Sequence, residues 1–311
     1  MSPLSSGTIR GNWATLIIPI QAGGSIDFRA LETEIDQLIS FHPDGIYSNG
    51  TAGEFYNQTE EEFDRISELL AAKCRRSGTA FQLGCSHMSP MTSLQRVKRA
   101  VPLAPGAIQV ILPDWYPPSM AEIIDFLRVI GDAARPIGLV LYNPPHAKKR
   151  LDPQDYGEII RSGVPVIGCK TAGGNENWYK EMKTYSDNLS LFVPGHTLAS
   201  GYILGAHGAY SNVACLHPGA AQRWYECMKT DPDSALELET RIRRFMGDHI
   251  IPFITREGYS NQAVDKLLVA IGGWSDLSPR LRWPYRSISA DAVPFLRKAA
   301  RNLIPEFFPE G

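Results

Sequence analysis

Short apolar runs alternate with amphipathic segments along most of this 311-residue chain. The apolar runs have the length of buried strands, and the segments between them repeat apolar residues at helical spacing. About eight such units follow one another, a number and rhythm that predict a closed (β/α)₈ TIM barrel rather than an open, doubly wound sheet. The strands are expected at residues 13–20, 44–50, 79–85, 107–113, 136–143, 164–170, 189–195 and 207–213.

The strand signal stops near residue 231, and helical patterns continue at 234–249, 261–273 and 291–304. We therefore expect residues 1–231 to form the catalytic barrel and residues 232–311 to form a helical extension packed on it.

Composition excludes several classes of protein. The formal net charge of −2 provides no general attraction for nucleic acid or for an anionic membrane. The five cysteines form no C-x-x-C pair and fit a reducing compartment, and the seven histidines show no metal-ligand spacing. The first residues lack the apolar segment of a signal peptide, and no run has the length of a membrane helix. We expect a cytoplasmic protein with no metal, no cofactor and no nucleic-acid or membrane partner.

One lysine stands at the end of an expected strand, in "VPVIGCKTAGG" (164–174). In a TIM barrel the active site lies at these strand ends, so Lys170 and Tyr142, which ends the neighbouring strand in "LYNPP", are expected to face one space. Burial lowers the pKa of a lysine, and a neutral amine beside a phenol is suited to Schiff-base formation with a ketone. The alternative is a solvated lysine just past the strand. Cys169 points to the opposite face of the strand and is expected to be a packing residue.

The second strand leads into "NGTAGEF". Gly50 and Gly53 would allow a tight turn in which the backbone amides of Thr51 and Ala52 face a carboxylate. Such a loop would hold the carboxylate of a 2-oxo acid while its ketone faces the lysine. A plain turn is the alternative.

"NGTAGEF", "LYNPP" and "VIGCKTAGGN", in this order, resemble the dihydrodipicolinate synthase and N-acetylneuraminate lyase superfamily, over residues 8 to about 215. The resemblance implies a metal-free class I aldolase or related lyase on a (β/α)₈ barrel, and a homotetramer or homodimer. It assigns imine formation with a small-molecule 2-oxo acid to Lys170 and proton transfer to Tyr142. Thr51 would bond to that tyrosine.

The chain also departs from the family patterns. Ala52 and Trp115 stand where dihydrodipicolinate synthases carry a threonine and a tyrosine, and Ala147 stands where they carry an arginine. His196 and Thr197 stand where neuraminate lyases carry carboxylates. Trp115 would otherwise be a subunit contact and Thr197 a helix cap. The residues expected to bind substrate are Gly50, Thr51, Ala52, Trp115, His146, His196, Thr197 and Tyr210.

These features favour retro-aldol cleavage of a 4-hydroxy-2-oxo acid to pyruvate and an aldehyde. One alternative is a dehydratase or deaminase acting on a 2-oxo-3-deoxy sugar acid or a hydroxyproline-derived pyrroline. The others are 4-hydroxy-tetrahydrodipicolinate synthase and an inactive protein that only binds a 2-oxo acid.

Overall fold

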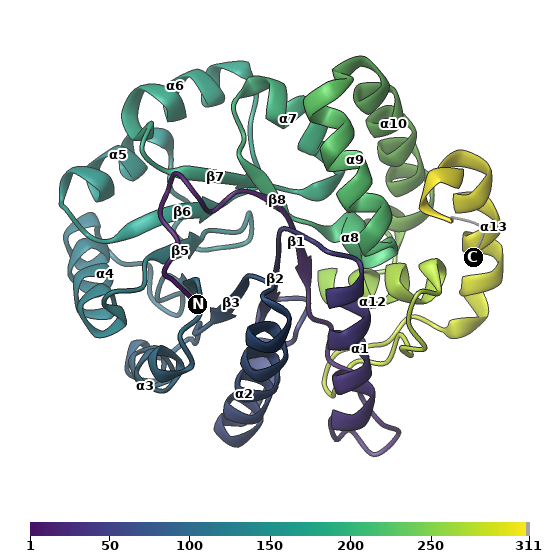
Figure 1. The fold of residues 1–311 in the computed structure, drawn as a ribbon, viewed down its shortest axis with the longest axis horizontal. Helices are drawn as coiled ribbons and strands as arrows, with labels where there is room; N and C mark the ends of the chain where they lie inside the picture. The colour runs from purple at the N-terminus through teal and green to yellow at the C-terminus, as the bar shows by residue number, and fades with distance from the viewer. Residues whose placement is uncertain (309–311) are drawn as a thin grey trace.

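The computed structural model describes residues 1–308, and its centre is a closed barrel of parallel strands in the order β1 to β8, with β8 paired to β1. Figure 1 shows these strands at the middle of the molecule with the helices around them. The predicted (β/α)₈ barrel is confirmed. The strands are β1 Gly11–Thr15, β2 Gly45–Ser48, β3 Phe81–Gly84, β4 Ala107–Ile111, β5 Leu139–Tyr142, β6 Val166–Lys170, β7 Ser190–Val193 and β8 Gly208–Tyr210.

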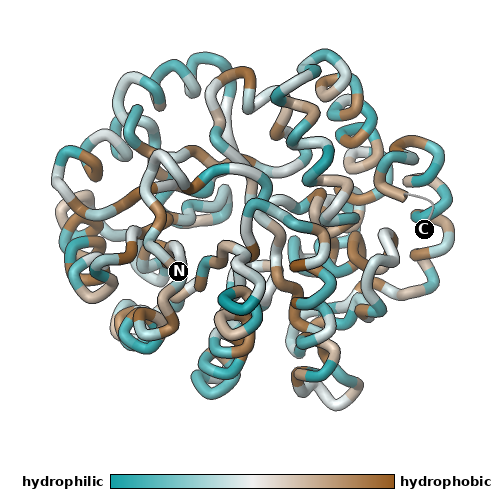
Figure 2. The backbone as a smooth tube through the Cα atoms, in the orientation of Figure 1, coloured by the Kyte–Doolittle hydropathy of each residue, from teal (hydrophilic) through white to brown (hydrophobic). Residues whose placement is uncertain are grey.

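Helices follow the strands and cover the outside of the barrel. Figure 2 shows hydrophilic and hydrophobic residues alternating along them, which is typical of helices with one face on a core. Thr59 and Glu62 form the predicted capping box of α2. The helices of the barrel are α1 Phe28–Ser40, α2 Glu60–Ser77, α3 Pro90–Ala100, α4 Met120–Ala134, α5 Pro153–Arg161, α6 Glu176–Ser186, α7 Leu198–Leu204, α8 Asn212–Leu216 and α9 Pro218–Thr230.

The strands are all shorter than the sequence predicted, and β1 and β8 end furthest before their expected last residues. β1 ends at Thr15 rather than near residue 20, because the backbone N–H of Ile17 donates to the buried Glu34 carboxylate (2.8 Å) instead of to a strand. β8 ends at Tyr210, because the Ser211 hydroxyl accepts the backbone N–H of Ala214 and begins helix α8. The strand expected over 207–213 therefore contains a helix start.

The period of two along the strands separates two apolar layers. Trp13, Tyr47, Val140, Phe192 and Tyr210 pack inside the barrel. The alternate residues, Cys169 among them, pack outward in the larger core between strands and helices. Cys169 is fully buried there, as predicted for a packing residue.

The C-terminal helices pack against the barrel. They are α10 Pro232–Phe245, α11 Ile251–Thr255, α12 Asn261–Gly272 and α13 Val293–Leu303, with a π-helical turn at Met246–Ile250 after α10. Helix α12 approaches α8 so closely that a Cβ atom at Gly272 would lie 1.6 Å from the carbonyl oxygen of Leu216. α12 therefore lies beside the barrel itself. The boundary at residue 231 stays a prediction.

A buried ion pair joins α12 to the loop after β2. Lys266 Nζ lies 2.6 Å from Glu54 Oε1, and both side chains are at most 3% exposed. The other Glu54 oxygen accepts the backbone N–H of Arg282 (3.1 Å), and Lys266 also donates to the carbonyl oxygen of Arg280 (2.7 Å). With these hydrogen bonds satisfied, the pair holds the C-terminal helix against the loop that carries Thr51.

Glu54→Gln is expected to lower the free energy of unfolding by about 3–5 kcal/mol, because it leaves the Lys266 charge buried without its partner. Urea denaturation measures this change. The control is Arg128→Ala, which breaks the exposed pair with Asp125 and should cost less than about 1 kcal/mol. Equal losses in the two variants would contradict the role given to the buried pair.

Candidate active site

Lys170 ends β6 directly beside Tyr142 of β5, as the register of the two strands requires. Its Nζ lies 4.3 Å from the centre of the Tyr142 ring, 4.9 Å from that of Tyr47 and 5.4 Å from that of Tyr210. It also donates a hydrogen bond to the Tyr47 phenol oxygen (3.4 Å). The lysine is therefore enclosed by three aromatic rings at the mouth of the barrel.

Burial lowers the pKa of Lys170 to about 8, while the charge of Asp265 acts in the opposite direction. The uncharged amine is therefore much more abundant near neutral pH than in an exposed lysine, whose pKa is about 10.4. An uncharged amine has the free electron pair that attack on a carbonyl carbon requires. The interpretation of Lys170 as a solvated lysine past the strand does not fit this burial.

Thr51 and Tyr142 form the polar contact that the sequence predicted. The Thr51 hydroxyl donates to the Tyr142 phenol at 3.4 Å. Burial raises the pKa of Tyr142, so its phenol is protonated at neutral pH and is able to donate a proton close to Lys170.

The loop after β2, which carries Thr51, has a different backbone conformation from the one expected. Gly50 and Gly53 do not adopt left-handed backbone; Asn49 and Glu54 do, each with φ of 52°. Gly50 is needed instead for space, because a Cβ atom there would lie 2.8 Å from the Tyr47 ring. Within residues 1–308, the backbone N–H groups of Thr51 and Ala52 donate to no protein acceptor.

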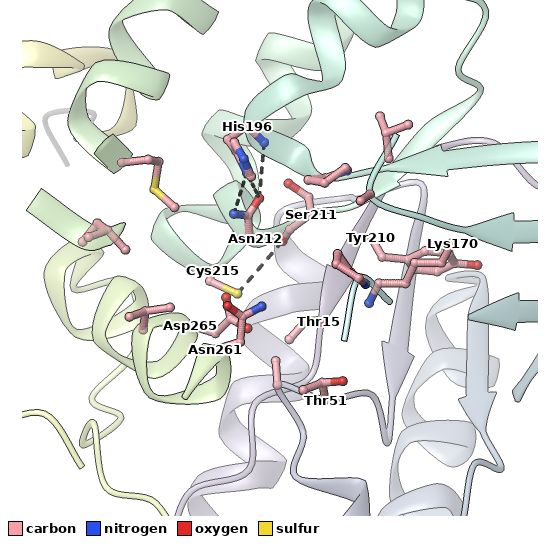
Figure 3. Close-up of a pocket in the computed structure, with 18 of the residues that line it drawn as sticks. Thr15, Thr51, Lys170, His196, Tyr210, Ser211, Asn212, Cys215, Asn261 and Asp265 are labelled. Carbon is pink, nitrogen blue, oxygen red and sulfur yellow. Dashed lines mark hydrogen bonds between the residues drawn. The ribbon is translucent and has the colours of Figure 1, made fainter. Parts of the chain in front are cut away.

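These residues open into a cavity of about 380 Å³ at the barrel mouth (Figure 3). Thr51, Ala52, Tyr142, Lys170, His196 and Tyr210, all singled out from the sequence, line it. His196 is paired with the Asn212 side-chain amide, with Nδ1 and Nδ2 2.9 Å apart, and burial lowers the pKa of His196. The structure thus brings six predicted residues into one cavity.

The other predicted residues lie elsewhere. Trp115 is 79% exposed, and the Lys148 ammonium stacks on its ring, 5.0 Å from the centre. His146 is also exposed, and neither residue lines the cavity. Thr197 does not line the cavity, and its hydroxyl donates to the carbonyl oxygen of Pro194 (3.1 Å) and makes no capping hydrogen bond to α7. Gly50 is buried and does not line the cavity.

Several residues that line the cavity were missed from the sequence, and Tyr47 and Asp265 are the two that act most directly on Lys170. Tyr47 lies in β2 with its ring inside the barrel. The alternation of side chains along this strand, counted back from the "NGTAGEF" motif that follows it, could have identified Tyr47 as an inward-facing residue. Asp265 lies in α12, where the mostly buried apolar segment "AVDKLLVAI" contains an acidic residue that is itself only partly exposed. Burial raises the pKa of Asp265 to about 7, although the Lys170 charge opposes this. A charge within an apolar helix face was the signal that could have identified it.

Residues 1–308 contain neither a candidate metal cluster nor a candidate membrane span. Between residues 1 and 308, no cluster of three or more His, Cys, Asp or Glu side chains is arranged to hold a metal ion. Over the same residues, no helix combines the length and the apolar character needed to span a bilayer.

A barrel with an enclosed lysine beside a tyrosine at its carboxyl edge defines a class of Schiff-base lyases. The model of the dihydrodipicolinate synthetase family matches residues 8–302, and the chain belongs to this family. It is an enzyme of the carbon–carbon or carbon–oxygen lyase type, as the sequence predicted.

Individual relatives are distant but match over almost the whole chain. An N-acetylneuraminate lyase of Escherichia coli is 23% identical over 305 residues, which cover 96% of this chain and 98% of the relative. The sialic acid aldolase of Ruminococcus gnavus superposes with a TM-score of 0.82 at 18% identity, covering 96% of this chain and 98% of that one. YagE of Escherichia coli K12, solved with pyruvate, has a TM-score of 0.82 at 19% identity, covering 95% and 98%.

Imine formation with pyruvate is expected to accelerate as pH rises, to reach half of its maximal rate near pH 8 and to level off about one pH unit higher, because the uncharged amine accumulates as pH passes the pKa of Lys170. Rapid mixing, borohydride quenching and mass spectrometry of the Lys170 peptide measure this rate. A rate that keeps rising beyond pH 9.5 would contradict a lowered pKa. The groups that face or act on Lys170 are Tyr47 of β2, Tyr142 of β5, Tyr210 of β8, Cys215 of α8 and Asp265 of α12.

Proposed function

We propose that this enzyme cleaves a 4-hydroxy-2-oxo acid to pyruvate and an aldehyde through a Schiff base on Lys170. The observation that carries the proposal is the lowered pKa of Lys170 inside a ring of tyrosines, one of which bonds to Thr51. The relatives named N-acetylneuraminate lyase and sialic acid aldolase support a retro-aldol reaction.

The substrate carboxylate would bind at the free backbone N–H groups of Thr51 and Ala52, which places the ketone toward Lys170. The amine attacks the C2 carbonyl carbon, and loss of water leaves a protonated imine. Tyr142 supplies the proton for the departing oxygen, because it is the protonated phenol beside Nζ.

Cleavage then uses the imine as an electron acceptor. The C4 hydroxyl gives its proton to the phenolate that Tyr142 became in the preceding step, and the C3–C4 bond breaks as the aldehyde C=O forms. The C3–C4 electron pair forms the C2=C3 bond and the imine pair moves to nitrogen, which gives a neutral enamine. Tyr142 then holds the proton that C3 needs. Protonation at C3 and hydrolysis of the imine release pyruvate and restore the free amine. Each step balances without an oxidant or a metal ion.

The charges around the cavity weigh against 4-hydroxy-tetrahydrodipicolinate synthase as the activity of this enzyme. Within residues 1–308, Lys170 is the one lysine or arginine that lines the cavity. Arg150, which could have replaced the arginine missing at Ala147, is exposed and outside it. A second carboxylate, as the aldehyde partner of 4-hydroxy-tetrahydrodipicolinate synthase carries, would find no second cation among the described residues that line the cavity.

The exposed Trp115 supports our prediction of a homotetramer or homodimer, because large exposed aromatic side chains are enriched at subunit contacts. A cytoplasmic location also stays our prediction, based on the five unpaired cysteines.

The proposed reaction is tested with Lys170→Ala. Wild-type protein should add one pyruvate to Lys170 under borohydride and should release pyruvate from 4-hydroxy-2-oxo acids in a lactate dehydrogenase assay. Lys170→Ala should do neither, whereas Lys180→Ala, which removes an exposed lysine of α6, should behave as wild type. Normal turnover by folded Lys170→Ala would overturn the proposal.

The same assay separates the remaining alternatives. Substrate loss without pyruvate would indicate a dehydratase or deaminase, because these eliminate water or ammonia and keep the carbon chain. An adduct on Lys170 without loss of any substrate would indicate a protein that only binds 2-oxo acids.

Tyr142→Phe is expected to slow imine formation by roughly 10²–10⁴-fold, since it removes the proton donor beside the amine. The matched control is Tyr156→Phe, which removes a buried phenol that has no hydrogen-bond partner in the described chain and does not line the cavity. Quenched-flow trapping with pyruvate compares the two variants. Unchanged trapping in Tyr142→Phe would exclude its assigned role.

A further inference from the structure

Asp265 is a carboxylate that lines the cavity and has no partner among residues 1–308. It projects from α12 across the cavity from Lys170, beside Asn261 and Cys215 (Figure 3). Within residues 1–308, no side chain or backbone N–H donates a hydrogen bond to it, and it forms no salt bridge. Asp265 is partly exposed to the cavity, so cavity water hydrates it when no ligand is bound. A ligand that displaces this water has to supply a hydrogen-bond donor, because a carboxylate that loses its water without gaining a donor is unfavourable.

The carboxylate is also held in place. The next residue, Lys266, forms the buried pair with Glu54, and Gly272 packs against the backbone of α8. α12 therefore has little freedom to turn Asp265 toward solvent. A fixed acceptor facing a cavity is able to select a ligand by geometry as well as by charge.

The surroundings of Asp265 limit the chemistry of the ligand group. The nearby wall is largely apolar on the side of the C-terminal helices, where Asn261 of α12 is the polar group beside Asp265, and His196 and Asn212 add polar groups on the side of the barrel. An anionic group would be repelled, and an ammonium would lose its hydration against the apolar wall and be repelled by the protonated imine on Lys170. A neutral hydroxyl group meets neither penalty. The apolar side chains are Met246, Ile250, Ile251, Ile254 and Val264.

We propose that Asp265 accepts a hydrogen bond from a hydroxyl group on the aldehyde half of the substrate, and so selects hydroxylated over plain alkyl chains. The inference rests on the proposed function, because it takes the 2-oxo acid to be bound through Lys170. Asp265 is a specificity residue at the far end of the cavity, and the chemistry at C2 to C4 remains with Lys170 and Tyr142.

Two substrates of equal carbon length test the proposal: 4,5,6-trihydroxy-2-oxohexanoate, which would give glyceraldehyde, and 4-hydroxy-2-oxohexanoate, which would give propanal. Asp265→Val should lower kcat/KM for the trihydroxy acid by roughly 10- to 100-fold, because the hydrogen bond to a charged acceptor is lost. The monohydroxy acid should change by less than about threefold. Asp265→Asn, which keeps an acceptor but not the charge, should lie in between.

Asp276→Asn is the matched control, because it removes an exposed acidic residue after α12 that does not line the cavity, and it should change neither substrate. Pyruvate trapping on Lys170 should persist in every Asp265 variant. Equal losses for both substrates, or no loss for either, would overturn the role of Asp265. Absence of trapping in the wild-type protein would instead overturn the proposed function, so the two failures are distinguishable.

Discussion

Removal of one amine from water is the constraint on which the site depends. Lys170 lies at the end of a barrel strand among three tyrosine rings, and this enclosure lowers its pKa to about 8. The apolar interior alone would lower the pKa without aiming the amine. The tyrosines do both, since their rings exclude water while the Tyr47 phenol oxygen accepts from Nζ. The active lysine is thus a product of the barrel as a whole.

A second constraint lies outside the barrel. The Glu54–Lys266 pair links the loop after β2 to α12, so the part of the cavity expected to hold the substrate carboxylate and the part that carries Asp265 are fixed to each other. Glu54 takes left-handed backbone to reach this partner, a conformation that is uncommon outside glycine. The C-terminal helices therefore complete the cavity rather than only covering the barrel.

Sequence reasoning predicted the barrel, and it brought Lys170, Tyr142 and Thr51 together, because strand-end positions in a closed parallel barrel converge whatever the details of the loops. It predicted β1 and β8 to be longer than they are, since buried apolar residues continue along the chain after the strand hydrogen bonds have ended. It did not identify Asp265, because the contact between α12 and the cavity depends on packing between segments distant in the chain. It also placed Trp115 and His146 in the cavity, where loop conformation rather than pattern decides the outcome.

The charges of Asp265 and Lys170 shift each other's pKa, and together they place a negative and a positive group on opposite sides of the cavity. The negative charge of Asp265 raises the pKa of Lys170, and the positive charge of Lys170 lowers that of Asp265, although burial dominates at both residues. Neither charge is cancelled by a direct contact in the described chain. When the lysine becomes a protonated imine, a positive charge persists across the cavity from the carboxylate. A substrate with an anionic head and a neutral, hydroxylated tail is therefore the one that fits both ends of this field.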